Sequence, residues 1–291
     1  MTIGAYRKRV EEDLRHSIEK LGEKNGLRDA CEYALTNGGK RLRPIFVLMI
    51  ADAIGEGLDA MPAALGVEFF HTASLIADDL PCMDDDDTRR SRPSLHKAFG
   101  ESVAILASYT LIAAGYGAIY ENGRKMKEHP HLGLRADEIS VLCLESATRC
   151  AGLKGATNGQ FLDLYPPDSK PETIQKIMFQ KTVTLFEISF IFGWLFGGGN
   201  PERLNLVRKC AYHLGMAFQI ADDLQDDLQD TGQQSAVNIA AVCGRDKAFS
   251  FFEEEMALFE KTLRDLDLFK GPLKEVVDWL LSLVPEKAPA T

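Results

Sequence analysis

Two aspartate-rich windows contain the residues best suited to chemistry. Six aspartates lie between Asp78 and Asp87, and five more lie between Asp222 and Asp230. Asp222 and Asp226 are four residues apart, which places both carboxylates on one face of a helix, where they repel each other. A hard divalent cation offsets such repulsion, and Mg²⁺ prefers oxygen ligands together with several retained waters. A solvated acidic helix end explains this second window equally well.

The first window needs a reversal of the chain. Asp78 and Asp84 are six residues apart, so an ideal helix would point them in different directions. Pro81 predicts a helix break just before it, which lets Asp84 return toward Asp78. His71 and Ser74 share a stripe with Asp78 on a helix that is otherwise apolar. A polar stripe in that setting indicates a cavity.

Basic residues accompany the aspartates. Arg89 and Arg90 follow the first window directly, and the segment 38–44, GGKRLRP, places a tight turn before a cationic helix start. Arginine binds diphosphate oxygens through its planar fork, and lysine binds them as a point charge. Neither window has the EF-hand ligand pattern, and neither contains the Glu-x-x-His motif of a di-iron bundle. The sequence therefore favours Mg²⁺ held between two aspartate clusters in a pocket for diphosphate.

Helices are the elements expected to position these groups, because apolar residues recur at helical spacing almost throughout. The sequence predicts an all-α fold, a large helical bundle in one domain over 1–291, with a disordered tail at 285–291. Gly and Pro punctuation sets the helix ends. The expected helices cover about 4–22, 27–37, 41–55, 60–80, 101–121, 136–152, 172–196, 201–229, 238–266 and 272–284.

Composition excludes several classes of protein. The net charge of -10 argues against a nucleic-acid partner, since phosphate contacts need a basic surface. Without the eleven clustered aspartates the remainder would be nearly neutral, so the acidity belongs to two places. The six cysteines form no C-x-x-C pair, which favours reduced, buried thiols. We expect a cytoplasmic protein with no signal peptide and no membrane span.

The motifs together closely resemble the trans-isoprenyl diphosphate synthases of the polyprenyl synthetase family, of geranylgeranyl or farnesyl type. The resemblance covers about residues 35–230. It rests on GGKRLRP at 38–44, SLIADDLPCMDDDDTRR at 74–90 and QIADDLQD at 219–226, with Gly159, Gln160, Asp163, Lys181 and Thr182 between them. It implies a helical isoprenoid synthase fold with a central substrate cavity.

The resemblance also implies site residues. The implied metal ligands are Asp78, Asp79, Asp84, Asp222, Asp223 and Asp226, with Asp78, Asp84 and Asp222 as the main ones. Residues implied to hold the diphosphate of isopentenyl diphosphate are Lys40, Arg43, His71 and Arg90. Those implied to hold the allylic diphosphate are Arg89 and Lys181. The implied catalytic residues are Lys181, Thr182 and Gln219, the last two stabilising a developing carbocation.

The implied reaction is ionisation, condensation and elimination, assisted by Mg²⁺, with three ions when substrate is bound. The substrates would be isopentenyl diphosphate and dimethylallyl, geranyl or farnesyl diphosphate, and the family implies a homodimer. Small residues at Ala73 and Ser74, just before the first aspartates, leave room for a longer chain. They favour a geranylgeranyl (C20) product over farnesyl (C15).

One departure concerns the segment after the second motif. The lysines usual there are missing, and Arg245 or Lys247 is the candidate to supply the charge. A terpene cyclase is a second reading, but it does not need the second set of basic residues. A non-catalytic subunit is a third, and such subunits usually lose one aspartate motif, whereas both are intact here.

Overall fold

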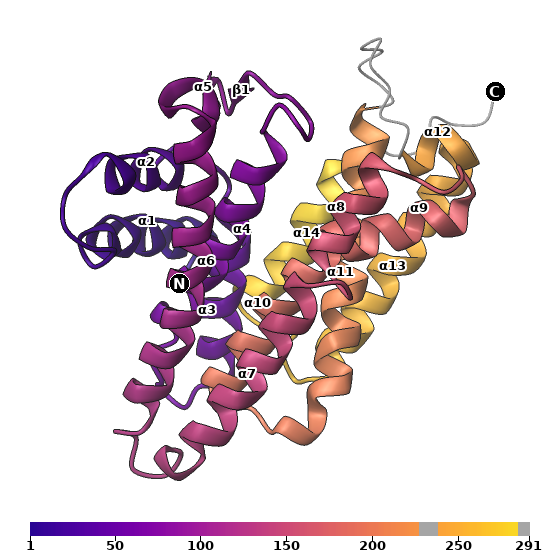
Figure 1. Ribbon diagram of the computed structural model, residues 1–291. Helices are drawn as coiled ribbons and strands as arrows, with labels where there is room; N and C mark the ends of the chain where they lie inside the picture. Colours follow the sequence, from indigo (N-terminus) through magenta and orange to yellow (C-terminus); the bar gives the residue numbers. More distant parts are fainter. Residues whose placement is uncertain (227–237, 285–291) are drawn as a thin grey trace. The chain divides into compact units, whose positions relative to one another are not determined.

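The computed structural model describes residues 1–226 and 238–284, and within them the fold is almost entirely helical. The α-helices are α1 (Ile3–Glu19), α2 (Gly26–Leu35), α3 (Leu42–Ile54), α4 (Met61–Asp78), α5 (Leu95–Phe99), α6 (Glu101–Met126), α7 (Ala136–Ala151), α8 (Ala156–Leu164), α9 (Pro171–Met178), α10 (Thr184–Phe196), α11 (Leu204–Asp226), α12 (Ile239–Cys243), α13 (Arg245–Asp265) and α14 (Pro272–Leu283). Figure 1 shows their order along the chain. The all-α prediction is confirmed.

Short elements complete the described chain. Two 3₁₀ turns, Gly133–Arg135 and Pro201–Arg203, precede α7 and α11, and a π-helical turn, Phe179–Val183, joins α9 to α10. One two-stranded hairpin is formed by β1 (Thr88–Arg89) and β2 (Arg92–Pro93). The sequence pattern did not predict the hairpin, α5, α8 or the π-turn.

The chain divides into two compact units. The first comprises Met1–Thr148 and Ile188–Pro201, and the second comprises Arg149–Glu187 and Glu202–Thr291. The first aspartate window belongs to the first unit, and the second window belongs to the second unit. The single domain stays a prediction, and the expected disordered tail at 285–291 lies outside the described residues.

In the first unit, α4 packs against α6, and the two helices run side by side in Figure 1. Small residues allow the close approach: a Cβ added at Gly66 would lie 3.0 Å from the Ala118 Cβ, and one at Gly115 would lie 2.6 Å from the Phe70 ring. From Met61 to Phe70 every residue of α4 is buried. The apolar composition of this helix predicts packing on more than one side, and the burial of these residues agrees with that prediction.

In the second unit, α11 packs against α13 and against the π-turn. One helix predicted at 238–266 is interrupted in the structure, so that expectation is wrong. Gly244 separates α12 from α13 with a φ of +83°, a conformation that glycine adopts without a steric penalty. The helix predicted at 172–196 is likewise divided by the π-turn.

Among the described helices, α6 alone is long and apolar enough to cross a membrane by length and composition. Of its most apolar window, 39% is buried inside the protein. One such helix is weak evidence for a membrane span, because core helices of water-soluble proteins have the same length and composition.

Candidate active site

The first aspartate window forms a tight turn at the end of α4. The helix ends at Asp78, and the backbone N–H of Asp84 donates to the Asp78 carbonyl at 2.9 Å. The Leu80 carbonyl accepts from the N–H groups of Met83 and Asp85 at 2.9 and 3.1 Å. The predicted reversal at Pro81 is confirmed, because this turn returns Asp84 to the helix end. Asp78 is half-buried, and Asp84 is exposed.

Asp79 differs from these two carboxylates because it is buried against Arg89. Its Oδ1 accepts from Arg89 Nε at 2.9 Å and also from Arg89 Nη2, which reaches Asp86 Oδ2 at 3.1 Å. Burial raises the pKa of Asp79, while the Arg89 hydrogen bond opposes that rise. The same bond raises the pKa of Arg89. Asp79, expected from the sequence as a metal ligand, therefore orients Arg89 in this structure.

Three of the predicted diphosphate-binding residues of the first unit lie near one another. Arg43 Nη1 is 3.3 Å from His71 Nε2, and Arg90 Nη1 donates to the Gly38 carbonyl. Gly39 has a φ of +113°, and a Cβ there would lie 2.5 Å from the Arg90 guanidinium carbon. Glycine adopts this positive φ without strain, and its lack of a side chain leaves room for the Arg90 guanidinium.

His71 lies among these arginines. Burial, followed by the charges of Arg43, Arg90, Arg41 and Arg89, lowers the pKa of His71 well below its ordinary value. A neutral imidazole surrounded by guanidinium groups is suited to a dianionic ligand. The fourth predicted residue of this group, Lys40, is exposed beside Gly39 in the sequence.

Replacing His71 by glutamine is expected to flatten the dependence of stability on pH. Below about pH 6.5 the unfolded chain binds a proton that folded His71 does not. The free energy of unfolding therefore falls as pH drops from 6.5 toward the folded pKa, by up to about 1.4 kcal/mol per pH unit. Urea unfolding across this range measures the slope, with exposed His131→Gln as the control. An unchanged slope in His71→Gln contradicts the prediction.

In the second unit, the second aspartate window is connected to the π-turn by hydrogen bonds. Thr182 Oγ1 donates to Gln219 Oε1 at 3.0 Å, and Gln219 Nε2 donates to Asp223 Oδ1 at 2.9 Å. Asp223 is buried, whereas Asp222 is half-buried. The structure thus brings together three residues predicted for the site, and the side chain of Asp226 lies outside the described residues.

Asp223 also holds the start of α12. Its Oδ2 accepts the backbone N–H of Ile239 at 2.8 Å, and Asn238 Nδ2 donates to the Asp223 carbonyl at 3.2 Å.

Arg245 Nη1 donates to the Leu224 carbonyl at 2.9 Å. Of the two cations considered as substitutes for the missing lysines, Arg245 contacts the end of α11. Lys247 lies 5.7 Å from the Phe251 ring centroid.

A residue of α8 holds the Lys181 side chain in place. Its Nζ forms an ion pair with Asp163, and the π-turn that contains it packs on Gly159. A Cβ at Gly159 would lie only 2.2 Å from the Lys181 backbone nitrogen. π-turns are rare and often occur at functional sites. Hydrophobic periodicity gives no signal for such a turn, so Lys181 and Thr182 could be predicted from the sequence but their backbone conformation could not.

Comparison with known proteins identifies the family. The family model described as polyprenyl synthetase matches residues 24–237. The chain belongs to this family. It is 37% identical over 217 residues to a putative geranylgeranyl pyrophosphate synthase 8, chloroplastic, of Arabidopsis thaliana, which covers 72% of this chain and 57% of the relative. It is 35% identical over 225 residues to a farnesyl diphosphate synthase of Bacillus subtilis, covering 75% and 72%.

Solved structures of similar proteins share this fold. A geranyltransferase of Legionella pneumophila has a TM-score of 0.81 at 27% identity, covering 97% of this chain and 95% of that one. An FPP/GFPP synthase of Zymomonas mobilis has a TM-score of 0.79 at 26% identity, covering 95% and 98%. The match spans less than two thirds of the plant relatives' length.

The polyprenyl synthetase family is generally Mg²⁺-dependent, and the carboxylates present suit that ion. Asp78 and Asp84 adjoin each other through a backbone hydrogen bond, and Asp222 lies one residue from the Gln219–Asp223 pair. Carboxylate oxygens are the ligands that Mg²⁺ prefers over softer donors.

Proposed function

We propose that the chain is a magnesium-dependent prenyltransferase that condenses isopentenyl diphosphate with allylic diphosphates, with geranylgeranyl diphosphate as the product. The observation that carries the proposal is the presence of two separate sets of diphosphate-binding side chains beside intact aspartate motifs. Arg43, His71 and Arg90 form one set, and Arg89, oriented by Asp79, belongs to the other. A terpene cyclase ionises one diphosphate and has no use for the second set.

The proposed roles follow from what each group can offer. Arg89 and Lys181 hold the allylic diphosphate, while Lys40, Arg43, His71 and Arg90 hold the diphosphate of isopentenyl diphosphate. When bound at Asp78, Asp84 and Asp222, with Asp226 as a further candidate, Mg²⁺ supplies positive charge for the departing diphosphate. The three-ion complement implied by the resemblance belongs to this proposal.

The chemistry needs no covalent nucleophile. The allylic C–O bond breaks, and its electron pair leaves with the diphosphate, to which Arg89 and Lys181 donate. The double bond of isopentenyl diphosphate then attacks the allylic cation, and a proton passes to the departed diphosphate as a double bond is restored. Thr182 and Gln219, joined by a 3.0 Å hydrogen bond, offer oxygen dipoles that stabilise the cation.

Incubation with isopentenyl diphosphate, an allylic primer and Mg²⁺ tests the proposal. Dimethylallyl, geranyl and farnesyl diphosphate are supplied in turn, and the extracted products are sized by mass. Chain growth to C20 is the expected result. Growth that stops at C15 identifies a farnesyl diphosphate synthase, and no growth with any primer identifies a non-catalytic subunit.

Product length is expected to respond to the residues before the first aspartates. Ala73 is fully buried in α4, and Ser74 is half-buried with its Oγ donating to the His71 carbonyl at 2.9 Å. Ala73→Phe or Ser74→Phe adds a ring that shortens the space for the growing chain, so the product should shift from C20 to C15. Overpacking costs typically 1–3 kcal/mol, so melting temperatures are measured in parallel. An unchanged product in two folded variants places the chain-length limit elsewhere.

We further propose that the chain forms a homodimer through α6. One face of this helix exposes Leu106 at 50% and Tyr109 at 64%, beside Ile105 and Ile112. A contiguous apolar face of this kind is typical of a protein interface. Leu106→Arg combined with Tyr109→Arg should give a monomer in light scattering, whereas Leu134→Arg, at a residue that is 97% exposed on a turn, should not. A parent protein that is monomeric, or that needs detergent, contradicts the proposal.

A further inference from the structure

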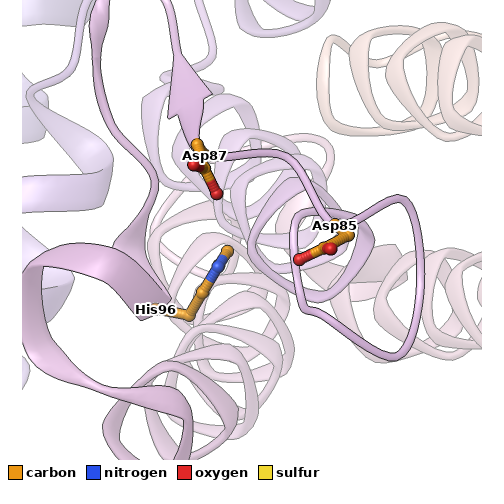
Figure 2. A group of neighbouring side chains, drawn as sticks. All are labelled: Asp85, Asp87 and His96. Carbon is orange, nitrogen blue, oxygen red and sulfur yellow. The ribbon is translucent and has the colours of Figure 1, made fainter.

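Three side chains just beyond the first aspartate motif gather without a part in the proposed reaction. Ligand atoms of Asp85, Asp87 and His96 all lie within 4.8 Å of one another. Figure 2 shows the His96 imidazole directed toward the two carboxylates. Both aspartates are exposed, and His96 is buried.

The hairpin is what brings these residues together. Thr88 pairs with Pro93 in its ladder, and the Ser94 N–H donates to the Asp87 carbonyl at 2.9 Å, just beyond that pair. This bond fixes Asp87 beside the segment that leads into His96. The turn at the end of α4 fixes Asp85 through its N–H bond to the Leu80 carbonyl. The backbone therefore defines all three positions.

His96 is the member that points to a ligand. The residue is 7% exposed, and one of its ring nitrogens, Nδ1, lies 3.1 Å from Ser94 Oγ. The other, Nε2, is buried with no hydrogen-bond partner among the described residues. Leaving a buried polar atom unpaired costs about 1–3 kcal/mol. When Nδ1 donates to Ser94, Nε2 presents a lone pair, which is the arrangement that metal-bound histidines adopt.

We propose that Asp85, Asp87 and His96 form a second metal site, which takes a divalent transition metal of the Zn²⁺ class. Two carboxylates and one imidazole match Zn²⁺, whereas Mg²⁺ is bound through oxygen alone. Metal–ligand bonds of about 2.0–2.2 Å require the three ligand atoms to close by roughly 1 Å. Only the exposed side chains of Asp85 and Asp87 need to move for that.

A lysine at the same place shows how the carboxylates attract a cation. Lys97 Nζ lies 2.6 Å from Asp87 Oδ1, so one oxygen of Asp87 already faces a positive charge. Lys97 is exposed, so it can remain on Oδ1 while the other carboxylate oxygen of Asp87 binds the metal. It can also move into solvent when the metal binds. Bound metal would connect the turn that follows Asp84 to α5.

Zn²⁺ binding to the full chain tests the site without substrates. The protein is freed of metal by chelator, and Zn²⁺ is titrated calorimetrically in excess Mg²⁺, which saturates the oxygen-only carboxylates. One Zn²⁺ per chain is expected at this site. Asp85→Asn, Asp87→Asn and His96→Gln should each weaken it at least about tenfold, and Ser94→Ala should weaken it about 10- to 100-fold. Co²⁺ in place of Zn²⁺ should give visible absorption that the same variants lose.

Matched variants separate the site from general charge effects. Asp137→Asn removes an exposed carboxylate paired with Lys127 at 2.7 Å, as Asp87 is paired with Lys97, and it should leave Zn²⁺ affinity unchanged. If His96→Gln does not fold, the two exposed aspartate variants decide alone. No Zn²⁺ binding in excess Mg²⁺, or equal affinity in parent, Asp85→Asn and Asp87→Asn, overturns the proposal. Neither outcome bears on prenyl transfer, which is measured separately.

Discussion

Asp78→Asn and Asp222→Asn are each expected to lower kcat by about 10²–10³-fold while the fold is kept. Asparagine has the size of aspartate but not its charge, so the change removes the negative charge of a proposed metal ligand. Positive charge aimed at a departing anion contributes more in the transition state than in the ground state. The loss should therefore appear in kcat, with a higher Mg²⁺ concentration needed for half-maximal rate.

Stability distinguishes this catalytic role from a structural one. Asp78 and Asp222 are half-buried within groups of like charge, and neutralising one member relieves repulsion. The melting temperature without Mg²⁺ should therefore stay equal or rise in both variants. Asp137→Asn, an exposed change of the same charge, is the control for activity. A sharp fall in melting temperature would show that these carboxylates support the fold instead.

Asp79 and Asp223 differ from Asp78 and Asp222 in what their carboxylates contact. Asp79 holds Arg89, and Asp223 joins Gln219 to the start of α12. Both are buried, whereas Asp78 and Asp222 are not. Sequence spacing treats adjacent aspartates alike, because burial depends on which face of the helix meets the rest of the chain. The motif thus predicts an acidic site, and only the structure separates the half-buried carboxylates from the buried ones that orient neighbours.

Local rules predicted most of the helices and the turn that forms the first site. Pro81 reverses the chain by steric exclusion, and Gly39 forms a tight turn with a φ of +113°, because each residue acts on its own stretch of backbone. The π-turn at Phe179–Val183 could not be predicted in this way. It depends on α8 packing against the turn at Gly159, a contact between segments that local pattern does not report.

Arg41 is a second case of a contact between distant segments that local pattern does not report. The sequence shows Arg41 within a basic motif and gives no sign of which residue it pairs with. In the structure Arg41 is 3% exposed, and its guanidinium bonds Glu11 Oε1 at 2.7 Å, the Leu35 carbonyl at 2.5 Å and the buried Glu68. Burial would lower the pKa of Arg41, but Glu68 and Glu11 raise it overall, so its charge is kept. The residue therefore ties α1, α2 and α4 to the start of α3.

Arg41→Met is expected to lower the free energy of unfolding by about 3–5 kcal/mol, because it leaves Glu68, which is 1% exposed, without a compensating charge. That is a large part of the 5–15 kcal/mol typical of a folded domain. Arg41→Lys should also destabilise, since one ammonium group cannot reproduce the planar fork. Urea unfolding measures both, with exposed Arg7→Met expected to change stability by no more than about 0.5 kcal/mol.

The double variant Arg41→Met with Glu68→Met isolates the cause. Removing both charges leaves neither Arg41 nor Glu68 as an unpaired buried ion, and a well-packed apolar replacement of a buried pair is often neutral or stabilising. The double variant should therefore be more stable than Arg41→Met alone, and a double-mutant cycle gives the coupling energy between the two side chains. If the losses simply add, Arg41 acts through its bonds to Glu11 and Leu35, and the charge of Glu68 is compensated by other groups.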